Sequence, residues 1–235
     1  MFRRFHALIP ARSGSKRVEN KNLRNLAGRP LIEWTLEAAA NSQELEQVFV
    51  STDSEEIRQA ALQYNFAAPE LRPKHLATDE AKMIDVMRHV VLRFELPSSD
   101  YLVLLQPTSP LRCGSHISEA IGELAFGSEA DGLVSVQRMP KLFDPSILQT
   151  MTDDNHLTSI VKGETLVENP PPEVIYFARN GPAILITKVE TILSGKKFGA
   201  VTLGYEMDAV SSIDIDTDDD FFIAEQFMKR RLEKR

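Results

Sequence analysis

The loop Ile9–Asn22 concentrates basic and small residues directly after a short apolar run. Gly14 and Ser15 let backbone N–H groups approach phosphate oxygens, and Arg12 and Lys21 supply positive charge. The loop is not a Walker A motif, because G-x-x-x-x-G-K-[ST] is absent, and its single glycine excludes a G-x-G-x-x-G fingerprint. A strand that ends in such a loop favours a polyphosphate-binding site over the alternative, a solvated basic surface loop.

Two aspartates near the end of the chain, Asp214 and Asp216, are separated by one residue. On an extended backbone their side chains point to the same side, and paired carboxylates suit Mg²⁺ with its retained waters. Helix capping is the alternative: Asp216 or Thr217 caps a last helix whose first turn holds residues 218–220. Asp214 fits capping poorly, because a charge between two isoleucines needs a partner. We therefore expect a metal site at Asp214 and Asp216.

Two further loops carry polar groups that could bind a ligand. Gln106–Arg112 follows a strand-like run, and the amide of Gln106 can both donate to and accept from a sugar. Its two prolines are equally compatible with a simple turn. In the loop Arg72–Asp79, Arg72 could contact a phosphate or a base, although a surface salt bridge is the commoner role for an isolated arginine.

Together these loops indicate nucleotidyl transfer. That reaction needs a metal to bridge a triphosphate and a nucleophile, and cations to stabilise the departing pyrophosphate. Other chemistries lack their signatures: the sequence contains no H-x-x-x-H pair and no G-x-S-x-G, and the single cysteine, Cys113, stands outside any nucleophile motif.

Composition narrows the class of protein. The 235 residues suit one α/β domain, and a net charge of −7 argues against a nucleic-acid or membrane-surface binder. Cys113 alone excludes an intrachain disulfide and fits a reducing compartment. The apolar runs are too short to span a bilayer, and no secretory leader is evident. We expect a cytoplasmic protein.

Apolar runs alternate with helical patterns along the chain, which predicts right-handed βαβ crossovers and a mainly parallel sheet. Strands are expected at residues 5–9, 47–51, 101–105, 132–136, 183–187 and 200–203, and helices at 30–41, from 55, 82–96, 115–126 and 218–232. Ligands of such sheets bind beyond the carboxyl ends of the strands. The basic loop, Thr52-Asp53 and Gln106–Arg112 all follow strands, so we expect them to converge on one cleft.

The alternation breaks between about residues 138 and 179. This stretch holds five of the chain's prolines and short strand-like pieces such as Leu157–Val161. Its apolar residues argue against a disordered linker. We expect a single domain, 1–235, with an inserted dimerisation arm at about 138–179.

Five segments in this order resemble the CMP-sialic acid synthetase family, the acylneuraminate or nonulosonate cytidylyltransferases. They are Ile9–Asn22, Ser51-Thr52-Asp53, Arg72–Asp79, Leu104–Arg112 and Ser212–Asp216. The resemblance implies a Rossmann-like nucleotide-diphospho-sugar-transferase fold and a homodimer. It also implies Mg²⁺-dependent synthesis of a CMP-sugar and pyrophosphate from CTP and a nonulosonic acid, with neither nucleic acid nor membrane as a partner.

By position, the resemblance also implies roles for particular residues. It assigns CTP binding to Ala11, Arg12, Ser15, Lys21, Asn22, Arg72 and Asp79, and sugar binding to Gln106, Thr108, Ser109 and Asn180. Asp214 and Asp216 are the implied Mg²⁺ ligands, and with Arg12 and Lys21 they form the implied catalytic set. In these roles Lys21 offsets the charge of the leaving pyrophosphate.

The chain departs from the family pattern at two places. Lys82 and Met83 stand where the family often has small hydroxyl residues near the base, and Pro182 follows Asn180-Gly181. Candidates for binding the sugar carboxylate are Lys141, Lys162 and Arg179. Sialic, legionaminic, pseudaminic and octulosonic acids all stay open as acceptors. Two alternatives also stay open: an octulosonate (Kdo-type) cytidylyltransferase and a catalytically inactive nucleotide-binding homologue.

Overall fold

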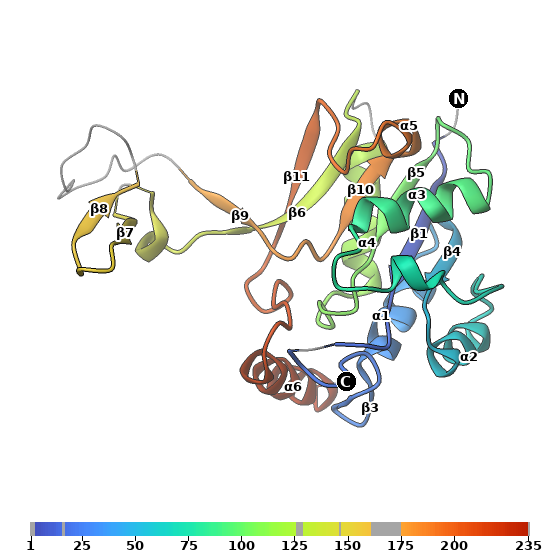
Figure 1. The fold of residues 1–235 in the computed structure, drawn as a ribbon, viewed down its shortest axis with the longest axis horizontal. Helices are drawn as coiled ribbons and strands as arrows, with labels where there is room; N and C mark the ends of the chain where they lie inside the picture. Colours follow the sequence, from blue (N-terminus) through green and yellow to red (C-terminus); the bar gives the residue numbers. More distant parts are fainter. Residues whose placement is uncertain (1–2, 16, 126–128, 146, 161–174, 235) are drawn as a thin grey trace.

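The computed structural model describes residues 3–15, 17–125, 129–145, 147–160 and 175–234. A seven-stranded sheet forms its centre, with the order β11-β6-β10-β5-β1-β4 and with β9 paired to β6 (Figure 1). The strands are β1 Phe5–Pro10, β4 Leu45–Ser51, β5 Tyr101–Leu104, β6 Gly132–Arg138, β9 Phe177–Arg179, β10 Leu185–Lys188 and β11 Thr202–Met207. The predicted α/β fold with a mainly parallel sheet is confirmed.

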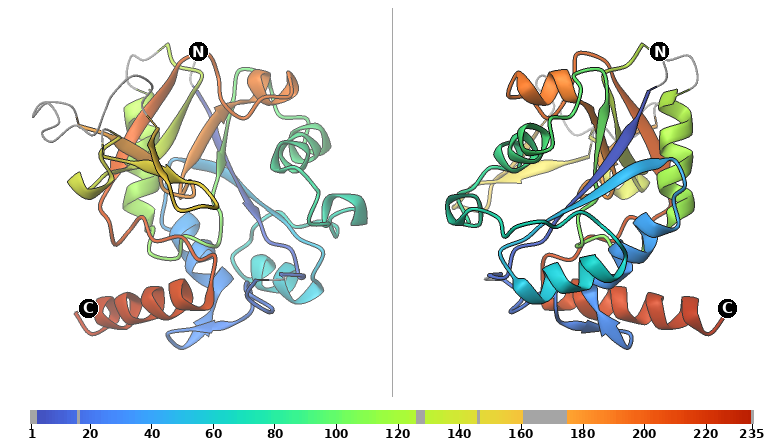
Figure 2. Two further views of the ribbon diagram at one scale, coloured as in Figure 1. Left: turned by 60° about the vertical axis from the view of Figure 1, so that its left-hand side comes forward. Right: turned by 90° about the vertical axis from the view of Figure 1, so that its right-hand side faces the viewer.

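Helices cover both faces of the sheet, as Figure 2 shows. They are α1 Leu31–Ala40, α2 Glu55–Gln63, α3 Met83–Arg93, α4 Gly114–Ala125, α5 Val189–Leu193 and α6 Asp218–Leu232. The predicted helices correspond to five of these, and the short α5 was not foreseen. No helix in the described ranges is both long and apolar enough to cross a membrane.

Alternation along β1 explains why its residues are almost all apolar. Ala7 and Ile9 belong to the core cluster beneath α1 and α4, whereas Leu8 belongs to the cluster beneath α3 and α5. Because successive side chains point to opposite faces, a strand covered on both faces buries every residue. Its polar side chain, His6, has the carboxylate of Asp100 as a partner at 3.1 Å. The whole of β1 is buried accordingly.

Two strands reverse the parallel pattern, and one of them, β9, pairs antiparallel with β6 alone. β10 pairs antiparallel with both β5 and β6, whereas β1 pairs parallel with β4 and β5, and β11 parallel with β6. The chain returns from the arm through β9 at the carboxyl edge of the sheet, so β10 enters the sheet from that edge. Gly132 allows the close approach of β6 and β10, because a Cβ there would lie 2.3 Å from the carbonyl oxygen of Ile186.

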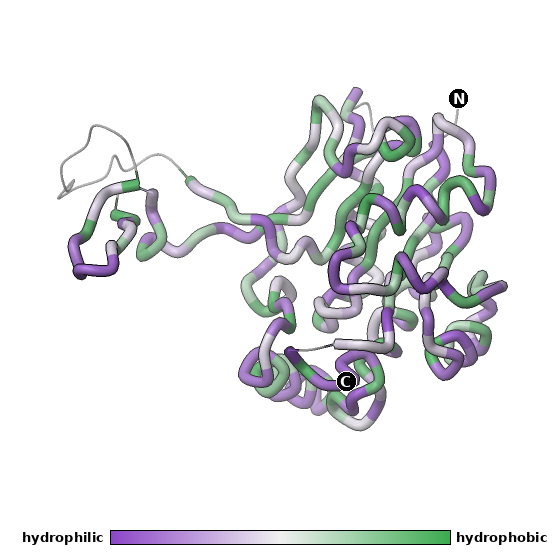
Figure 3. Tube along the Cα trace, viewed as in Figure 1, coloured by the Kyte–Doolittle hydropathy of each residue, from purple (hydrophilic) through white to green (hydrophobic). Residues whose placement is uncertain are grey.

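The inserted segment projects away from the sheet (Figure 1). It contains a short 3₁₀ turn, Lys141–Phe143, and the hairpin β7 Gln149–Met151 with β8 Leu157–Ser159. Hydrophobic and hydrophilic residues alternate along its trace (Figure 3). Its exposed large apolar side chains are Leu142, Phe143, Ile147, Met151, Leu157, Ile160, Ile175 and Phe177. Lys162 and the three consecutive prolines lie outside the described residues.

A third apolar cluster connects the C-terminal helix to the site. Phe221 and Met228 of α6 pack with Trp34 of α1, with Val18 of the basic loop and with Ile215. The small hairpin β2 Asn25–Leu26 and β3 Arg29–Pro30 adds Leu26. Burial of Ile215 therefore fixes the backbone that carries Asp214 and Asp216.

Candidate active site

The basic loop is held at the carboxyl end of β1. Ala11 is fully buried, and its N–H donates to the carbonyl oxygen of Ser51 at 2.9 Å. The side-chain amide of Asn22 donates to the carbonyl oxygen of Arg12 at 2.9 Å. The fold gives no steric reason for Gly14, since a Cβ there would meet no atom within 4 Å. Open space in front of this glycine is consistent with a ligand that approaches the backbone.

Two carboxylates contact the basic loop at positions where we expect phosphate oxygens to bind. The N–H and hydroxyl of Ser13 donate to the carboxylate of Asp53 at 2.7 and 2.8 Å. The guanidinium of Arg12 lies 2.5 Å from the carboxylate of Asp79. Arg12 and Asp79, both predicted to bind the nucleotide, thus lie side by side. Ser15, also predicted, is half-buried in the same loop.

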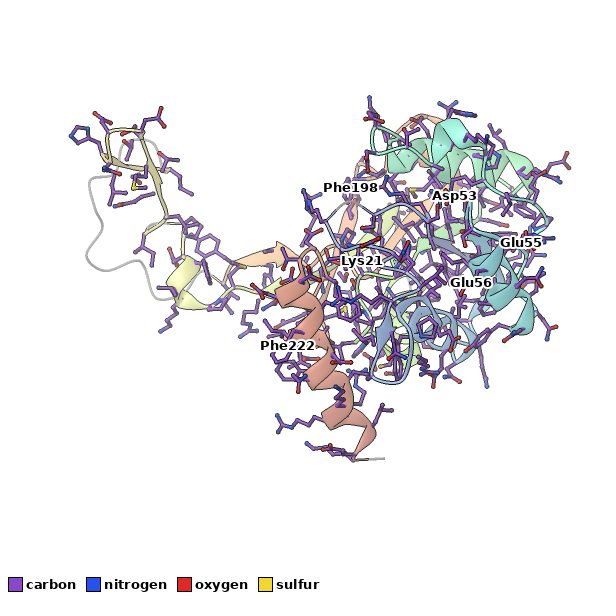
Figure 4. The ribbon with its side chains drawn as sticks, turned by 60° about the horizontal axis from the view of Figure 1, so that its bottom comes forward. Lys21, Asp53, Glu55, Glu56, Phe198 and Phe222 are labelled. Carbon is purple, nitrogen blue, oxygen red and sulfur yellow. The ribbon has the colours of Figure 1, made fainter. Side chains whose placement is uncertain are left out.

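Lys21 links this loop to the acidic segment. Its Nζ donates to the carbonyl oxygen of Ile215 at 2.6 Å. Burial lowers the pKa of Lys21, and the nearby carboxylates of Asp216 and Asp214 oppose that shift. The predicted phosphate loop and the predicted carboxylate pair are therefore brought together. Figure 4 marks Lys21, with Asp53 and Phe198 on the same side of the molecule.

Asp214 and Asp216 flank the fully buried Ile215, whose N–H donates to the carbonyl oxygen of Thr108 at 2.8 Å. The hydroxyl of Ser109 lies 3.4 Å from Oδ1 of Asp214. Burial raises the pKa of Asp214; a hydrogen bond from Thr108 lowers it and the charge of Asp216 raises it further. Asp216 is exposed.

The remaining acidic residues cap α6, as the sequence predicted. Thr217 is the N-cap, and its hydroxyl accepts from the N–H of Asp220 at 3.2 Å in a capping box. Asp218 pairs with Arg24. The cap is thus Thr217 rather than Asp216, whose carboxylate lies 3.3 Å from Arg17. No group of three or more histidine, cysteine, aspartate or glutamate side chains positioned for a metal occurs within the described part of the chain.

Arg112 is the site feature that sequence reasoning missed. Its side chain is 1% exposed, and its guanidinium donates to the carbonyl oxygens of Gln106 and Ala183 at 3.1 and 2.7 Å and to the hydroxyl of Thr35 at 2.8 Å. Burial lowers the pKa of Arg112 to about 10. Its position at the end of a loop with two prolines gave no signal of burial. The hydrogen bond from Arg112 to the carbonyl oxygen of Gln106 helps to position the backbone of this half-buried residue.

Arg72, predicted to lie beside the nucleotide, is also buried. Its Nε donates to the hydroxyl of Ser51 at 2.9 Å, and its Nη2 donates to the Ser51 carbonyl oxygen. Burial lowers its pKa to about 10, and the charge of Asp53 opposes that shift. The guanidinium thus joins the end of β4 to the loop that carries Asp79. Contact between Arg72 and a nucleotide stays a prediction.

Asn180, predicted to bind the sugar, is 6% exposed and surrounded by protein partners. Its side-chain oxygen accepts from Ser135 at 2.6 Å and from the N–H of Ala183 at 3.3 Å, and its amide nitrogen donates to Ser212 at 2.9 Å. These contacts connect β6, the entry of β10 and the segment before Asp214. The amide thus helps to position the acidic segment, and its contact with a sugar stays a prediction.

An α/β sheet whose carboxyl edge gathers a basic loop and two carboxylates defines a nucleotide-binding site of the nucleotidyltransferase type. Residues 6–227 match the profile of the family described as "Cytidylyltransferase". The chain belongs to this cytidylyltransferase family.

The names of similar proteins agree with membership of the cytidylyltransferase family. The chain is 36% identical, over 91% of its length, to an N-acylneuraminate cytidylyltransferase of Streptococcus agalactiae, of which it covers 51%. It is 34% identical to the CMP-N,N'-diacetyllegionaminic acid synthase of Legionella pneumophila, with 98% of both chains covered. The chain therefore spans about half the length of its N-acylneuraminate relatives and nearly all of the Legionella protein.

Solved structures confirm the fold. The chain superposes with a TM-score of 0.70 on a CMP:2-keto-3-deoxy-manno-octonic acid synthetase in complex with CTP, covering 97% of this chain and 99% of that one at 15% identity. A 4-diphosphocytidyl-2C-methyl-D-erythritol synthase of Anaerococcus prevotii gives a TM-score of 0.63 at 12% identity. At such identities these likenesses concern the fold alone.

Asn180→Leu tests whether Asn180 is structural. The change keeps the side-chain volume but leaves the hydroxyls of Ser135 and Ser212 without this partner, so we expect the free energy of unfolding to fall by about 2–4 kcal/mol. Urea unfolding measures the loss. Ser212→Ala, which removes only one of these hydrogen bonds, should cost about 1 kcal/mol. Unchanged stability together with weakened binding of an acceptor sugar would instead indicate direct contact with the ligand.

Proposed function

We propose that this protein transfers CMP from CTP to the anomeric hydroxyl of a nonulosonic acid and releases pyrophosphate. The oxygen of that hydroxyl forms a bond to the α-phosphorus, and the bond from the α-phosphorus to the bridging oxygen of the β-phosphate breaks. The observation that carries the proposal is the junction of Lys21 with the backbone of Ile215, which joins the phosphate loop to the carboxylate pair. We infer a cytoplasmic location, because CTP is a cytoplasmic substrate.

Arg12 and Lys21 have the charge that the leaving group needs. Arg12 is half-buried and pairs with Asp79, so an incoming triphosphate can exchange for that carboxylate without exposing an unpaired cation. Lys21 is positioned by Ile215 between the loop and the aspartates. Prepositioned cations stabilise the negative charge that develops on pyrophosphate.

Asp214 and Asp216 suit Mg²⁺ as its protein ligands. Mg²⁺ binds through one or two carboxylates and keeps waters and substrate phosphates as its other ligands, so a set of two aspartates is sufficient. The two carboxylates are close enough for the charge of Asp216 to raise the pKa of Asp214, and a cation between them relieves that repulsion. When bound, Mg²⁺ supplies charge neutralisation of the triphosphate.

We propose that Asp214 also accepts the proton of the attacking hydroxyl, as a general base. It is half-buried beside Ser109, whereas Asp216 is exposed. Ser109 and Thr108 hold its orientation through hydrogen bonds.

The two alternative functions have less support. An octulosonate acceptor is supported only by structural similarity to a synthetase that is 15% identical to this chain. The relatives named for nonulosonic acids are 34–36% identical. An inactive homologue is disfavoured, because Arg12, Lys21, Asp214 and Asp216 are all present and brought together.

We propose further that the arm forms a homodimer. Its exposed apolar side chains include Leu142, which is 72% exposed, and Phe143. A run of such residues on a projecting element needs a partner surface, and a second copy of the chain supplies one by symmetry.

A pyrophosphate-release assay tests the transfer. With CTP, Mg²⁺ and N-acetylneuraminic or N,N'-diacetyllegionaminic acid we expect turnover, and replacement of CTP by ATP should reduce it at least 100-fold, since the relatives that define the family use a cytidine nucleotide. Omission of the acceptor controls for hydrolysis of CTP. Equal turnover with ATP would contradict the cytidine assignment, and release only with an octulosonic acid would favour the alternative.

Asp216→Asn tests the metal assignment. The amide keeps the shape but removes a charge, so we expect turnover to fall about 100-fold or more while the fold is kept, since each ~1.4 kcal/mol of lost stabilisation is tenfold in rate. Asp214→Asn should behave similarly. The matched control is Asp219→Asn in the first turn of α6, which should change stability by only about 0.3–1 kcal/mol. Near-normal turnover of Asp216→Asn at saturating Mg²⁺ would refute the assignment.

Sedimentation equilibrium at micromolar concentration tests the dimer. We expect twice the chain mass of 26.4 kDa. Phe143→Glu should shift the protein toward monomer, because a charge cannot be buried at an apolar interface without a partner. Leu92→Glu, at a residue of α3 that is 60% exposed, serves as the matched control and should leave the mass unchanged. A monomeric wild-type chain with full activity would contradict the proposal.

A further inference from the structure

The single cysteine of the chain contacts a histidine at the start of α4. Cys113 directly precedes this helix, and its Sγ lies 3.4 Å from Nδ1 of His116. The same nitrogen accepts from the N–H of Cys113 at 3.2 Å, so its lone pair is turned toward this residue. The hydroxyl of Ser115 lies 3.2 Å from Sγ and can donate to it. Cys113 is therefore a thiol with a base beside it.

The surroundings of Cys113 favour the thiolate form. Burial raises the pKa of the thiol, but the hydrogen bonds with His116 and Ser115 outweigh burial, and the pKa is lowered to about 6. The N-terminus of the 12-residue helix α4 adds the positive end of a helix dipole. Thiolates are the reactive form of cysteine, and both features are typical of reactive cysteines. Because Cys113 is half-buried, small reagents can reach it.

A cavity of about 30 Å³ adjoins Cys113 and contains an unsatisfied donor. The Nε of the buried Arg112 side chain has no hydrogen-bond partner among the residues that the structure describes, whereas Nη1 and Nη2 donate to protein oxygens. A buried donor of this kind favours an oxygen-bearing ligand. A bound water needs roughly 10–15 Å³, so the cavity suits a ligand of one or two heavy atoms. Its lining residues include Glu37, Asn41, Arg112, Cys113, Gly114 and Arg231.

Packing around the cavity prevents it from holding a larger group. A Cβ on Gly114 would lie 2.8 Å from the carbonyl oxygen of Asn41, so the turn into α4 is already in close contact with the end of α1. On the neighbouring side, Nη2 of Arg231 donates to the carbonyl oxygen of Leu111 at 2.8 Å. These contacts tie the residues on both sides of Cys113 to α1 and α6.

Other charged groups near the cysteine come from neighbouring elements. Tyr205 of β11 donates to Glu119 of α4. Burial, this hydrogen bond and nearby negative charges, including that of the cysteine, raise the pKa of Tyr205. The charge of His116 acts on the carboxylate of Asp208, and the charge of the cysteine acts on Arg112. Because both signs of charge are present, the hydrogen bonds at the sulfur are what distinguish this thiol from an ordinary one.

We propose that Cys113 is an oxidation site at which hydrogen peroxide reacts in the small cavity. The thiolate attacks one peroxide oxygen, an S–O bond forms and the O–O bond breaks. The sulfur loses two electrons and becomes a sulfenic acid, and the peroxide is reduced. His116 gives the proton that it took from the thiol to the departing hydroxide, which leaves as water. Arg112 holds the peroxide by donating to one of its oxygens.

The fate of the sulfenic acid follows from the cysteine count. Cys113 is the only cysteine of the 235 residues, so no intrachain disulfide can form. A low-molecular-weight thiol therefore condenses with the sulfenic acid: an S–S bond forms, the S–O bond breaks and water leaves. The resulting mixed disulfide is larger than the cavity, so the added group extends into solvent. This chemistry is independent of the transfer reaction proposed above.

The test measures how fast the sulfenic acid forms. Protein is treated with hydrogen peroxide, the sulfenic acid is trapped with dimedone, and the adduct is counted by intact-mass spectrometry. We expect one adduct on the wild type and none on Cys113→Ser. His116→Ala should slow labelling at about pH 7 at least tenfold, because the thiolate fraction falls. The matched control is Leu92→Cys in a Cys113→Ser chain, an exposed thiol within α3, which should react at least tenfold more slowly than the wild type.

A pH profile separates activation of the thiol from simple access. The rate of alkylation by iodoacetamide should rise with a midpoint at about 6 in the wild type and at a clearly higher pH in His116→Ala. Equal rates for the wild type and the Leu92→Cys chain, or unchanged labelling and midpoint in a folded His116→Ala, would overturn the proposal. If thermal melting shows that His116→Ala does not fold, the comparison with the Leu92→Cys chain decides alone.

Discussion

A buried charge organises the edge of the sheet at which the ligands are expected to bind. Arg112 is almost inaccessible to water, yet its guanidinium donates only to neutral oxygens, from Gln106, Ala183 and Thr35. Burying a charge is costly unless its donors are satisfied, so displacement of any of these oxygens is penalised. The three oxygens come from the exit of β5, the entry of β10 and the helix α1. One side chain thereby holds these three segments at a fixed spacing.

Two carboxylates neutralise and bind the basic loop, which explains how it keeps one conformation in a protein of negative net charge. Asp53 accepts from the donors of Ser13, and Asp79 pairs with Arg12. Phosphate oxygens present the same kind of acceptor as these carboxylates, so the proposed nucleotide would replace one anion by another. The loop is thus held close to a binding geometry, which reduces the entropy that must be lost when a ligand is ordered.

The sequence predicted what depends on local pattern. The apolar run Phe5–Ile9 lies within β1, and the acidic turn that begins α6 has the predicted cap region at Thr217. It also predicted that the basic loop, Thr52-Asp53 and Gln106–Arg112 would converge, because all three follow strands and parallel strands end at one edge. The antiparallel direction of β10 was not predicted. A short apolar run indicates a strand, but it does not indicate which distant strands that strand pairs with or in which direction. The burial of Arg112 and the network of Asn180 escaped for the same reason, since their partners lie about 30 to 80 residues away in sequence. The roles of the site residues remain predictions.

The reversed strand β10 has a consequence for how this protein can change over time. In a wholly parallel sheet every connection that reaches the ligand edge leaves a strand, and its length can vary without disturbing the strand before it. Here the chain comes down the arm, passes through β9, and enters β10 at the ligand edge within residues 177–185. Arg179 and Gly181 therefore lie at the root of the arm and also line a pocket of about 390 Å³. A substitution in this short stretch would consequently alter the base of the arm and the lining of the pocket together, so the two cannot evolve independently.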